Sequence, residues 1–172
     1  MIRQIRILFS LLGIQAPPTG DAENGNKGTI ELDALWGNGT GDDSAEAIFF
    51  DGSRDLAAST SEDIDLATAL DIQGQALALA EVRILCIQTP ETNQGTIRMQ
   101  PSAADGWTSY LNADPGGTDA PYLNFPPGTT KFVAVGPDGA YAVGGGNDSI
   151  NFENLDGANP NTYALFIAGP RS

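Results

Sequence analysis

Short apolar segments, most of them ended by Gly, Pro, Asn or Asp, are the feature that most limits how this chain can fold. Polar and apolar residues alternate over Thr29–Trp36 and Glu62–Leu66, and Glu81–Thr89 contains a nearly continuous apolar run. Alternation with a period of two predicts half-buried strands, and a continuous run predicts a strand at the centre of a sheet. No repeat of 20 to 50 residues and no alternation of strands with helices is present, so we predict an all-β protein.

The spacing of these segments predicts about nine or ten strands, which is typical of a two-sheet sandwich. Two of them, over 149–152 and 162–168, are expected to form a closing hairpin with a loop over 153–161. We predict a jelly-roll-like antiparallel β-sandwich with an apolar N-terminal arm. At 172 residues the chain suits one core, and we divide it into an arm at 1–20 and a single sandwich domain at 21–172.

The N-terminal segment resembles a signal peptide, because Arg3 and Arg6 precede an apolar run that ends at Ile14. Cleavage after Ala16 would leave Pro17 beside the cut bond and Ile14 where a small residue is expected, which argues against that interpretation. The run is also too short for a transmembrane helix, and we predict no membrane partner. We expect it to bury itself against its own domain or a neighbouring subunit.

The apolar residues of this arm are the predicted assembly contacts. Leaving them all exposed to water would favour aggregation. Their spacing fits a helix through Ile5, Leu8 and Leu12, whereas the start Ile5-Arg6-Ile7 is a strand alternation, so both conformations stay open. The predicted contact residues are Ile5, Ile7, Leu8, Phe9, Leu11 and Leu12.

Composition removes several classes of function. The chain has no histidine, one cysteine and a net charge of −14. Cys86 lies in an apolar run, lacks a histidine partner for nucleophilic catalysis, and is expected to be a small core residue. The acidic surface repels phosphate, so we expect no nucleic-acid partner. Only 17% of residues are charged, and such a polar but weakly charged surface suits burial in an assembly.

Paired carboxylates and glycine-rich loops are the candidate catalytic and metal sites of the sequence. Asp63 and Asp65 share one face of a strand, as a glycosidase pair could, but that face is more simply a solvated one. Gly144–Ile150 resembles one copy of a calcium-binding repeat that needs stacked copies. A loose calcium site using Asp21, Asp42 or Asp43 is the remaining option. We predict no catalytic residues, no bound cofactor and no metal site, and hence no enzyme.

Aromatic residues beside polar loops suggest a different function. Trp107, Tyr110 and Tyr122 could stack on a sugar, as exposed aromatic rings do in glycan-binding modules. The alternative for each ring is ordinary core packing. We keep these three residues as the glycan contacts of an alternative hypothesis.

One stretch carries a family resemblance. Phe50–Leu66 contains Arg54-Asp55-Leu56-Ala57-Ala58 followed by Ser61-Glu62-Asp63-Ile64-Asp65-Leu66, which resembles a motif of small virion proteins of tailed bacteriophages. A strand like 81–87, a tryptophan segment like 106–107, a Pro-Pro-Gly turn like 126–128 and a final strand pair like 148–152 and 163–169 follow in the same order. The likeness covers about residues 46–169, and it implies a β-sandwich structural protein of the phage particle without catalytic residues.

The resemblance and the composition together lead to a functional hypothesis. We expect a capsid decoration or cement protein on the surface of the virion, which binds the major capsid protein or other virion proteins between capsomers. It would act as a homo-oligomer, with a trimer favoured. A tail or baseplate component is the second hypothesis, and a carbohydrate-binding or host-adhesion module is the third.

Overall fold

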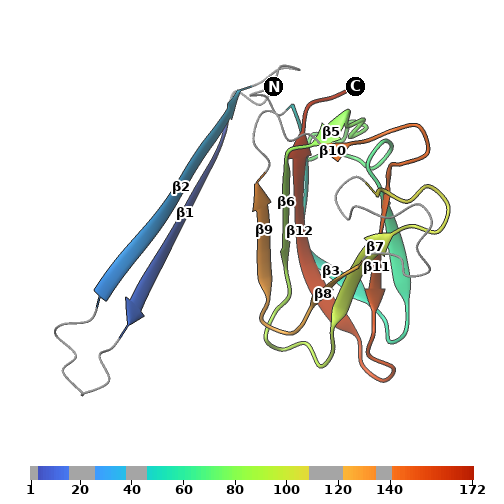
Figure 1. Ribbon diagram of the computed structural model, residues 1–172. Coiled ribbons are helices and arrows are strands. Elements are labelled where there is room, and N and C mark those ends of the chain that lie inside the picture. Colours follow the sequence, from blue (N-terminus) through green and yellow to red (C-terminus); the bar gives the residue numbers. More distant parts are fainter. Residues whose placement is uncertain (1–3, 16–25, 38–45, 109–121, 135–140) are drawn as a thin grey trace.

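The computed structural model describes residues 4–15, 26–37, 46–108, 122–134 and 141–172 (Figure 1). These residues form strands and turns, and no helix occurs among them. The strands are β1 (Gln4–Gln15), β2 (Asn26–Gly37), β3 (Ala47–Leu56), β4 (Ser61–Asp65), β5 (Glu81–Val82), β6 (Ile84–Gln88), β7 (Ile97–Pro101), β8 (Leu123–Phe125), β9 (Thr130–Ala134), β10 (Tyr141–Ala142), β11 (Ser149–Asn154) and β12 (Asn161–Gly169).

Eight of these strands build two facing sheets. One four-stranded sheet has the order β3-β12-β6-β9 and the other has the order β4-β11-β7-β8, and every strand pair within them is antiparallel. Figure 1 shows the two sheets as the two walls of the sandwich. The predicted all-β antiparallel sandwich is therefore confirmed.

Strands that follow one another along the chain cross between the sheets. The pairs β3 and β4, β6 and β7, β8 and β9, and β11 and β12 each place one strand in either sheet. The segment β3–β4 runs antiparallel to β11–β12, and β6–β7 runs antiparallel to β8–β9. This ribbon-like order supports the jelly-roll description, which stays a prediction.

The expected closing hairpin is wrong. β11 and β12 do not pair with each other, because β11 lies between β4 and β7 in one sheet and β12 lies between β3 and β6 in the other. Both strands were correctly placed along the sequence. Each is flanked on both sides in its sheet, and their inward residues Phe152 and Tyr163 stack across the core with ring centroids 4.6 Å apart.

The core lies between the sheets and follows the alternation of the strands. In β12 the inward positions Tyr163, Leu165 and Ile167 are buried, while the intervening positions are only partly buried. The strand predicted over 81–89 is confirmed as central for β6, which lies between β12 and β9, but its first residues form β5, which pairs with β10 in a separate two-stranded sheet. Other fully buried side chains include Trp107, Phe125, Phe152, Leu66, Leu77, Ile97, Met99 and Ile150.

The N-terminal arm is one strand of a hairpin that forms a sheet of its own. β1 and β2 pair antiparallel without a bulge from Gln4 opposite Gly37 to Gln15 opposite Asn26. The strand predicted over 29–36 therefore pairs with the arm and with neither sheet of the sandwich. Figure 1 shows this hairpin standing beside the sandwich and apart from it.

Candidate assembly surface

The hairpin register sorts the predicted contact residues of the arm onto two faces. Ile5, Ile7, Phe9 and Leu11 occupy alternate positions of β1 and therefore share one face. The positions opposite them in β2 are Trp36, Ala34, Leu32 and Ile30. Leu8 and Leu12 belong to the other face, where they lie opposite Asp33 and Thr29. We name the eight apolar positions of the first face the hairpin face.

Such a hairpin needs a covering surface. A two-stranded hairpin alone is at best marginally stable in water, and a third strand or a packed layer is needed to support it. Neither sheet of the sandwich adds a strand to β1 or β2. An apolar face of this length is therefore the strongest candidate in the described residues for contact with another molecule.

The sandwich carries a second apolar surface, on the outer side of the sheet β3-β12-β6-β9. The register sets Phe50, Phe166, Cys86 and Phe132 side by side across its four strands. Phe50 is 60% exposed, and its ring lies 6.5 Å from that of Phe166 in a tilted contact. We name this row of four residues the outer rung.

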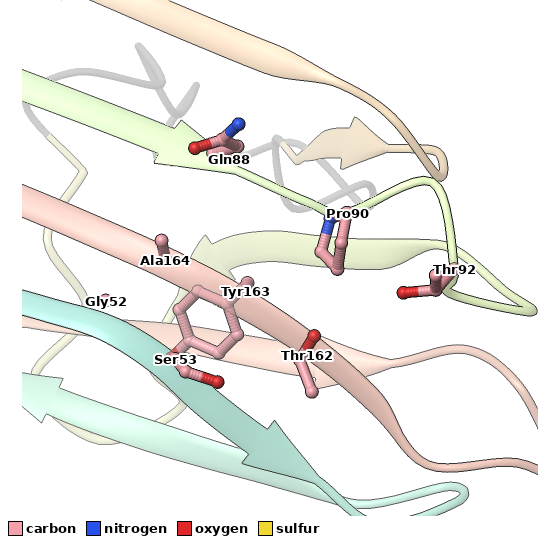
Figure 2. Close-up of a pocket in the computed structure, with 8 residues that line it drawn as sticks. All are labelled: Gly52, Ser53, Gln88, Pro90, Thr92, Thr162, Tyr163 and Ala164. Atoms are coloured by element: carbon pink, nitrogen blue, oxygen red, sulfur yellow. The ribbon is translucent and has the colours of Figure 1, made fainter.

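A hollow of about 400 Å³ lies beside the outer rung. Gly52 and Ala164 are the smallest of its lining residues, and the register between β3 and β12 shifts here between Tyr163 and Leu165. Figure 2 shows the lining residues around the end of β6 and the start of β12. They are all uncharged: Gly52, Ser53, Gln88, Pro90, Thr92, Thr162, Tyr163 and Ala164.

Cys86 belongs to this outer surface, which corrects the expectation of a core residue. In β6 the neighbours Leu85 and Ile87 are buried, so alternation turns Cys86 to the outer side, where it is half-buried. Partial burial raises the pKa of its thiol. As the one cysteine of the chain, it can report whether this surface is covered.

The motif that carries the family resemblance forms a clip between the two sheets. The Arg54 guanidinium donates to the carboxylate of Glu62, with Nε 3.0 Å from Oε1, and to Asp51 at 3.0 Å. The buried Tyr163 hydroxyl donates to the same Glu62 oxygen at 2.9 Å. Burial, and then the Glu62 charge, raise the pKa of Tyr163. The three strands β3, β4 and β12 are thus joined by charge-assisted hydrogen bonds, a role that the sequence pattern did not reveal.

Asp63 and Asp65, the candidate catalytic pair, both make hydrogen bonds that stabilise the fold. Asp63 accepts a hydrogen bond from Asn151 at 2.8 Å. Asp65 accepts from the backbone N–H of Ala67 at 2.8 Å and of Thr68 at 3.1 Å, and from the Thr68 hydroxyl. Partial burial alone would raise the pKa of Asp65, but these hydrogen bonds outweigh it and hold the pKa below its usual value. The carboxylate therefore stabilises the turn after β4.

This turn predicts a pH dependence of stability. Because the folded state lowers the pKa of Asp65, its contribution is present above the unfolded value of 3.8 and is lost as the pH falls through the folded pKa. We expect Asp65→Ala to cost about 1 kcal/mol at neutral pH, and the difference from wild type to shrink between about pH 5 and about pH 3. Urea denaturation across this range measures it, and a constant difference would contradict the assignment.

The glycan-contact prediction is corrected for Trp107. This residue is 1% exposed, and its indole N–H donates to the carbonyl of Ala142 at 2.9 Å, so it cannot stack on a sugar. Tyr110 lies outside the described residues. Tyr122 is 51% exposed and has the Arg98 guanidinium 4.6 Å from its ring centroid.

The described residues contain neither a metal-binding cluster nor a membrane-spanning helix. No group of three or more histidine, cysteine, aspartate or glutamate residues is placed to hold a metal ion in the described part of the chain. Gly144, Gly145 and Gly146 all have positive φ angles, which fits the turn that leads into β11. The loop residues Asp21, Asp42 and Asp43 lie outside the described residues. No helix long and apolar enough to cross a membrane occurs in the ranges that the structure describes.

Comparisons with known proteins were made for the whole chain. No protein-family model and no curated protein matches the sequence. Among solved structures the chain is similar to one from Bacillus endospore appendages, which form a novel family of disulfide-linked pili. That chain is 15% identical, the likeness covers 73% of this chain and 90% of that one, and the TM-score is 0.36. A likeness at this level establishes neither a shared fold nor a shared function.

Proposed function

We propose that this chain is a non-enzymatic structural protein of a tailed-phage particle, and specifically a capsid decoration protein that acts as a homo-oligomer between capsomers. The observation that carries the structural role is the hairpin, whose register brings eight apolar positions together on one face and which pairs with neither sheet of the sandwich. The phage setting comes from the motif around Arg54 and Glu62, and the clip between those residues supports the motif as a feature of this fold.

The proposed mechanism is mechanical. A protein that binds across the junction of capsid subunits adds buried surface to the assembled state and none to the separated state. By mass action it raises the free energy needed to pull the capsid apart. Buried apolar area contributes about 25 cal/mol per Å² before the costs of association are subtracted, and repetition over the lattice multiplies the effect.

The alternative hypothesis of a host-adhesion module is weakened, because its main proposed glycan contact, Trp107, is buried. A glycan platform needs exposed aromatic rings, and Trp107 is buried in the core. Tyr122 is exposed, but the Arg98 guanidinium lies over its ring in a cation–π contact. The tail or baseplate alternative predicts the same fold, so the test below distinguishes it by the particle that is bound.

Cosedimentation with phage capsids that lack this protein tests the proposal. We expect saturable binding at a fixed ratio to the major capsid protein. The double variant Phe9→Asp, Leu11→Asp places two charges on the hairpin face and should weaken binding at least about tenfold, because an unpaired charge in an apolar contact is costly. The variant Ser10→Asp changes the other face and serves as the control. Binding to tails and not to capsids would replace the decoration role by the tail role, and binding to neither particle would overturn the proposal.

A further inference from the structure

We propose that the hairpin of one copy packs on the outer rung of a second copy, so that each subunit in a closed ring gives one hairpin and receives one. This inference deepens the proposed function, because it identifies the surface of the same chain that the arm binds. It rests on the proposed function only in treating the hairpin as an assembly element. It concerns the free oligomer and needs no capsid.

The first step is that, among the described residues, no further strand pairs with the hairpin and Phe50 of the outer rung is largely exposed. The hairpin face holds eight apolar positions in register, and β1 and β2 pair only with each other. The outer rung exposes Phe50 to 60% beside an uncharged hollow. One contact between copies would cover both surfaces, and it gives the hairpin the supporting layer that a two-stranded sheet requires.

The second step is charge. The whole chain has a net charge of −14, so contacts between copies are opposed by repulsion over most of the surface. The two hairpin strands contain two positive residues, Arg6 and Lys27, and two negative residues, Glu31 and Asp33, so their net charge is zero. On the receiving sheet, the outward positions of the central strands are also uncharged: Thr162, Ala164 and Phe166 in β12, with Cys86 and Gln88 in β6. The hairpin of one copy and the central strands of the receiving sheet can therefore come into contact without burying an unpaired charge.

The third step is area. A hairpin of two 12-residue strands is about 40 Å long and about 10 Å wide, so one face covers about 400 Å². In a ring of two copies the same two chains make both contacts, so their interface buries about 800 Å² of each copy. A standard specific interface buries about 800 Å² per partner. One contact alone, as between neighbours in a larger ring, would bury half of that, so the area favours a closed ring of two copies.

Crosslinking between two distinguishable copies tests the contact directly. One chain carries Phe9→Cys with Cys86→Ala, the other is the wild-type chain with Cys86 as its one cysteine, and the two are refolded together. Sheets packed face to face lie about 10 Å apart, within reach of a short bismaleimide. A mixed crosslinked product can form only between copies. We expect at least about fivefold more of it than with Ser10→Cys, Cys86→Ala, which places the thiol on the opposite face of the hairpin.

The receiving surface is tested by Phe50→Ser in the full chain. Phe50 is largely exposed, so the sandwich should keep its circular dichroism while sedimentation shows smaller species and Cys86 alkylation accelerates about tenfold. Tyr122→Ser removes a similarly exposed ring from the end of the other sheet and should change neither. A monomeric wild-type chain, or an oligomer unaffected by Phe50→Ser, would overturn this inference and leave the capsid proposal to its own test. If the oligomer still crosslinked but did not bind capsids, the capsid proposal would be overturned and this inference would stand.

Discussion

Replacement of Trp107 with alanine is expected to lower the free energy of unfolding by about 3–5 kcal/mol, as for other buried large-to-small changes. The side chain is 1% exposed and belongs to the main core cluster. Its ring makes an edge contact with Tyr141 at 6.1 Å between centroids. Its indole N–H donates to the Ala142 carbonyl at 2.9 Å. The substitution therefore removes packing and one of the hydrogen bonds that the Ala142 carbonyl accepts, the other coming from the Asn147 amide at 3.3 Å.

Two companion variants separate these contributions. Trp107→Phe keeps an aromatic ring but removes the indole N–H, so we expect a smaller loss, of about 1–3 kcal/mol. Tyr122→Ala truncates an exposed ring and should stay within about 0.5 kcal/mol of wild type. Urea denaturation followed by far-ultraviolet circular dichroism provides all three values. If Trp107→Ala were as stable as Tyr122→Ala, the assignment of Trp107 to the core would be wrong.

The strands could be predicted from the sequence, but their partners could not. Alternation placed β11 and β12 correctly, because each inward residue is apolar and the period is local. Whether two successive strands pair with each other or cross to opposite sheets depends on contacts distant in sequence, such as those of β12 with β3. The polar loop over 155–160 permits either arrangement. The expected closing hairpin therefore failed at the level of topology and not of secondary structure.

The candidate surface shows the same division. The apolar arm residues were visible in the sequence, but the register with β2 was needed to separate Phe9 from Leu8. Cys86 lies in a run that is apolar at neighbouring positions, so no alternation of polar and apolar residues indicates whether its side chain points into the core or outwards. Trp107 stands beside polar loops whether it is exposed or buried. Only the fold places its ring in the core.

A buried asparagine at the end of β11 was not anticipated from the sequence, because asparagine usually indicates a loop surface. Asn154 is 1% exposed, and its amide group donates to the carbonyls of Leu56 at 3.2 Å, Ala57 at 3.0 Å and Asn159 at 2.9 Å. Its own carbonyl oxygen accepts from the Asp156 N–H at 2.9 Å. One side chain thus holds the turn after β3 and the loop after β11 together.

The network continues through a second buried asparagine. Asn161, which is fully buried, donates to the Asn154 carbonyl oxygen at 2.6 Å. Its own oxygen accepts from the N–H groups of Gln94 at 2.9 Å and Gly95 at 3.2 Å. Three loops at one end of the sandwich are therefore tied through two amide side chains, and loss of Asn154 would take away the acceptor of the buried Asn161 amide group.

Asn154→Ala is accordingly expected to lower the free energy of unfolding by about 2–4 kcal/mol, because several buried donors and acceptors lose partners at once. Asn151→Ala is the matched control on the same strand. Its amide bonds the exposed Asp63 carboxylate at 2.8 Å, where water can replace it, so the loss should stay below about 1 kcal/mol. Asn154→Asp adds a third comparison, because it keeps the acceptor but turns a carboxylate towards three carbonyl oxygens. Burial and those oxygens favour the protonated acid. This variant should therefore gain stability as the pH falls, whereas wild type loses stability at acid pH. If all three variants unfolded at the same urea concentration, the amide network would not be what holds this end of the sandwich closed.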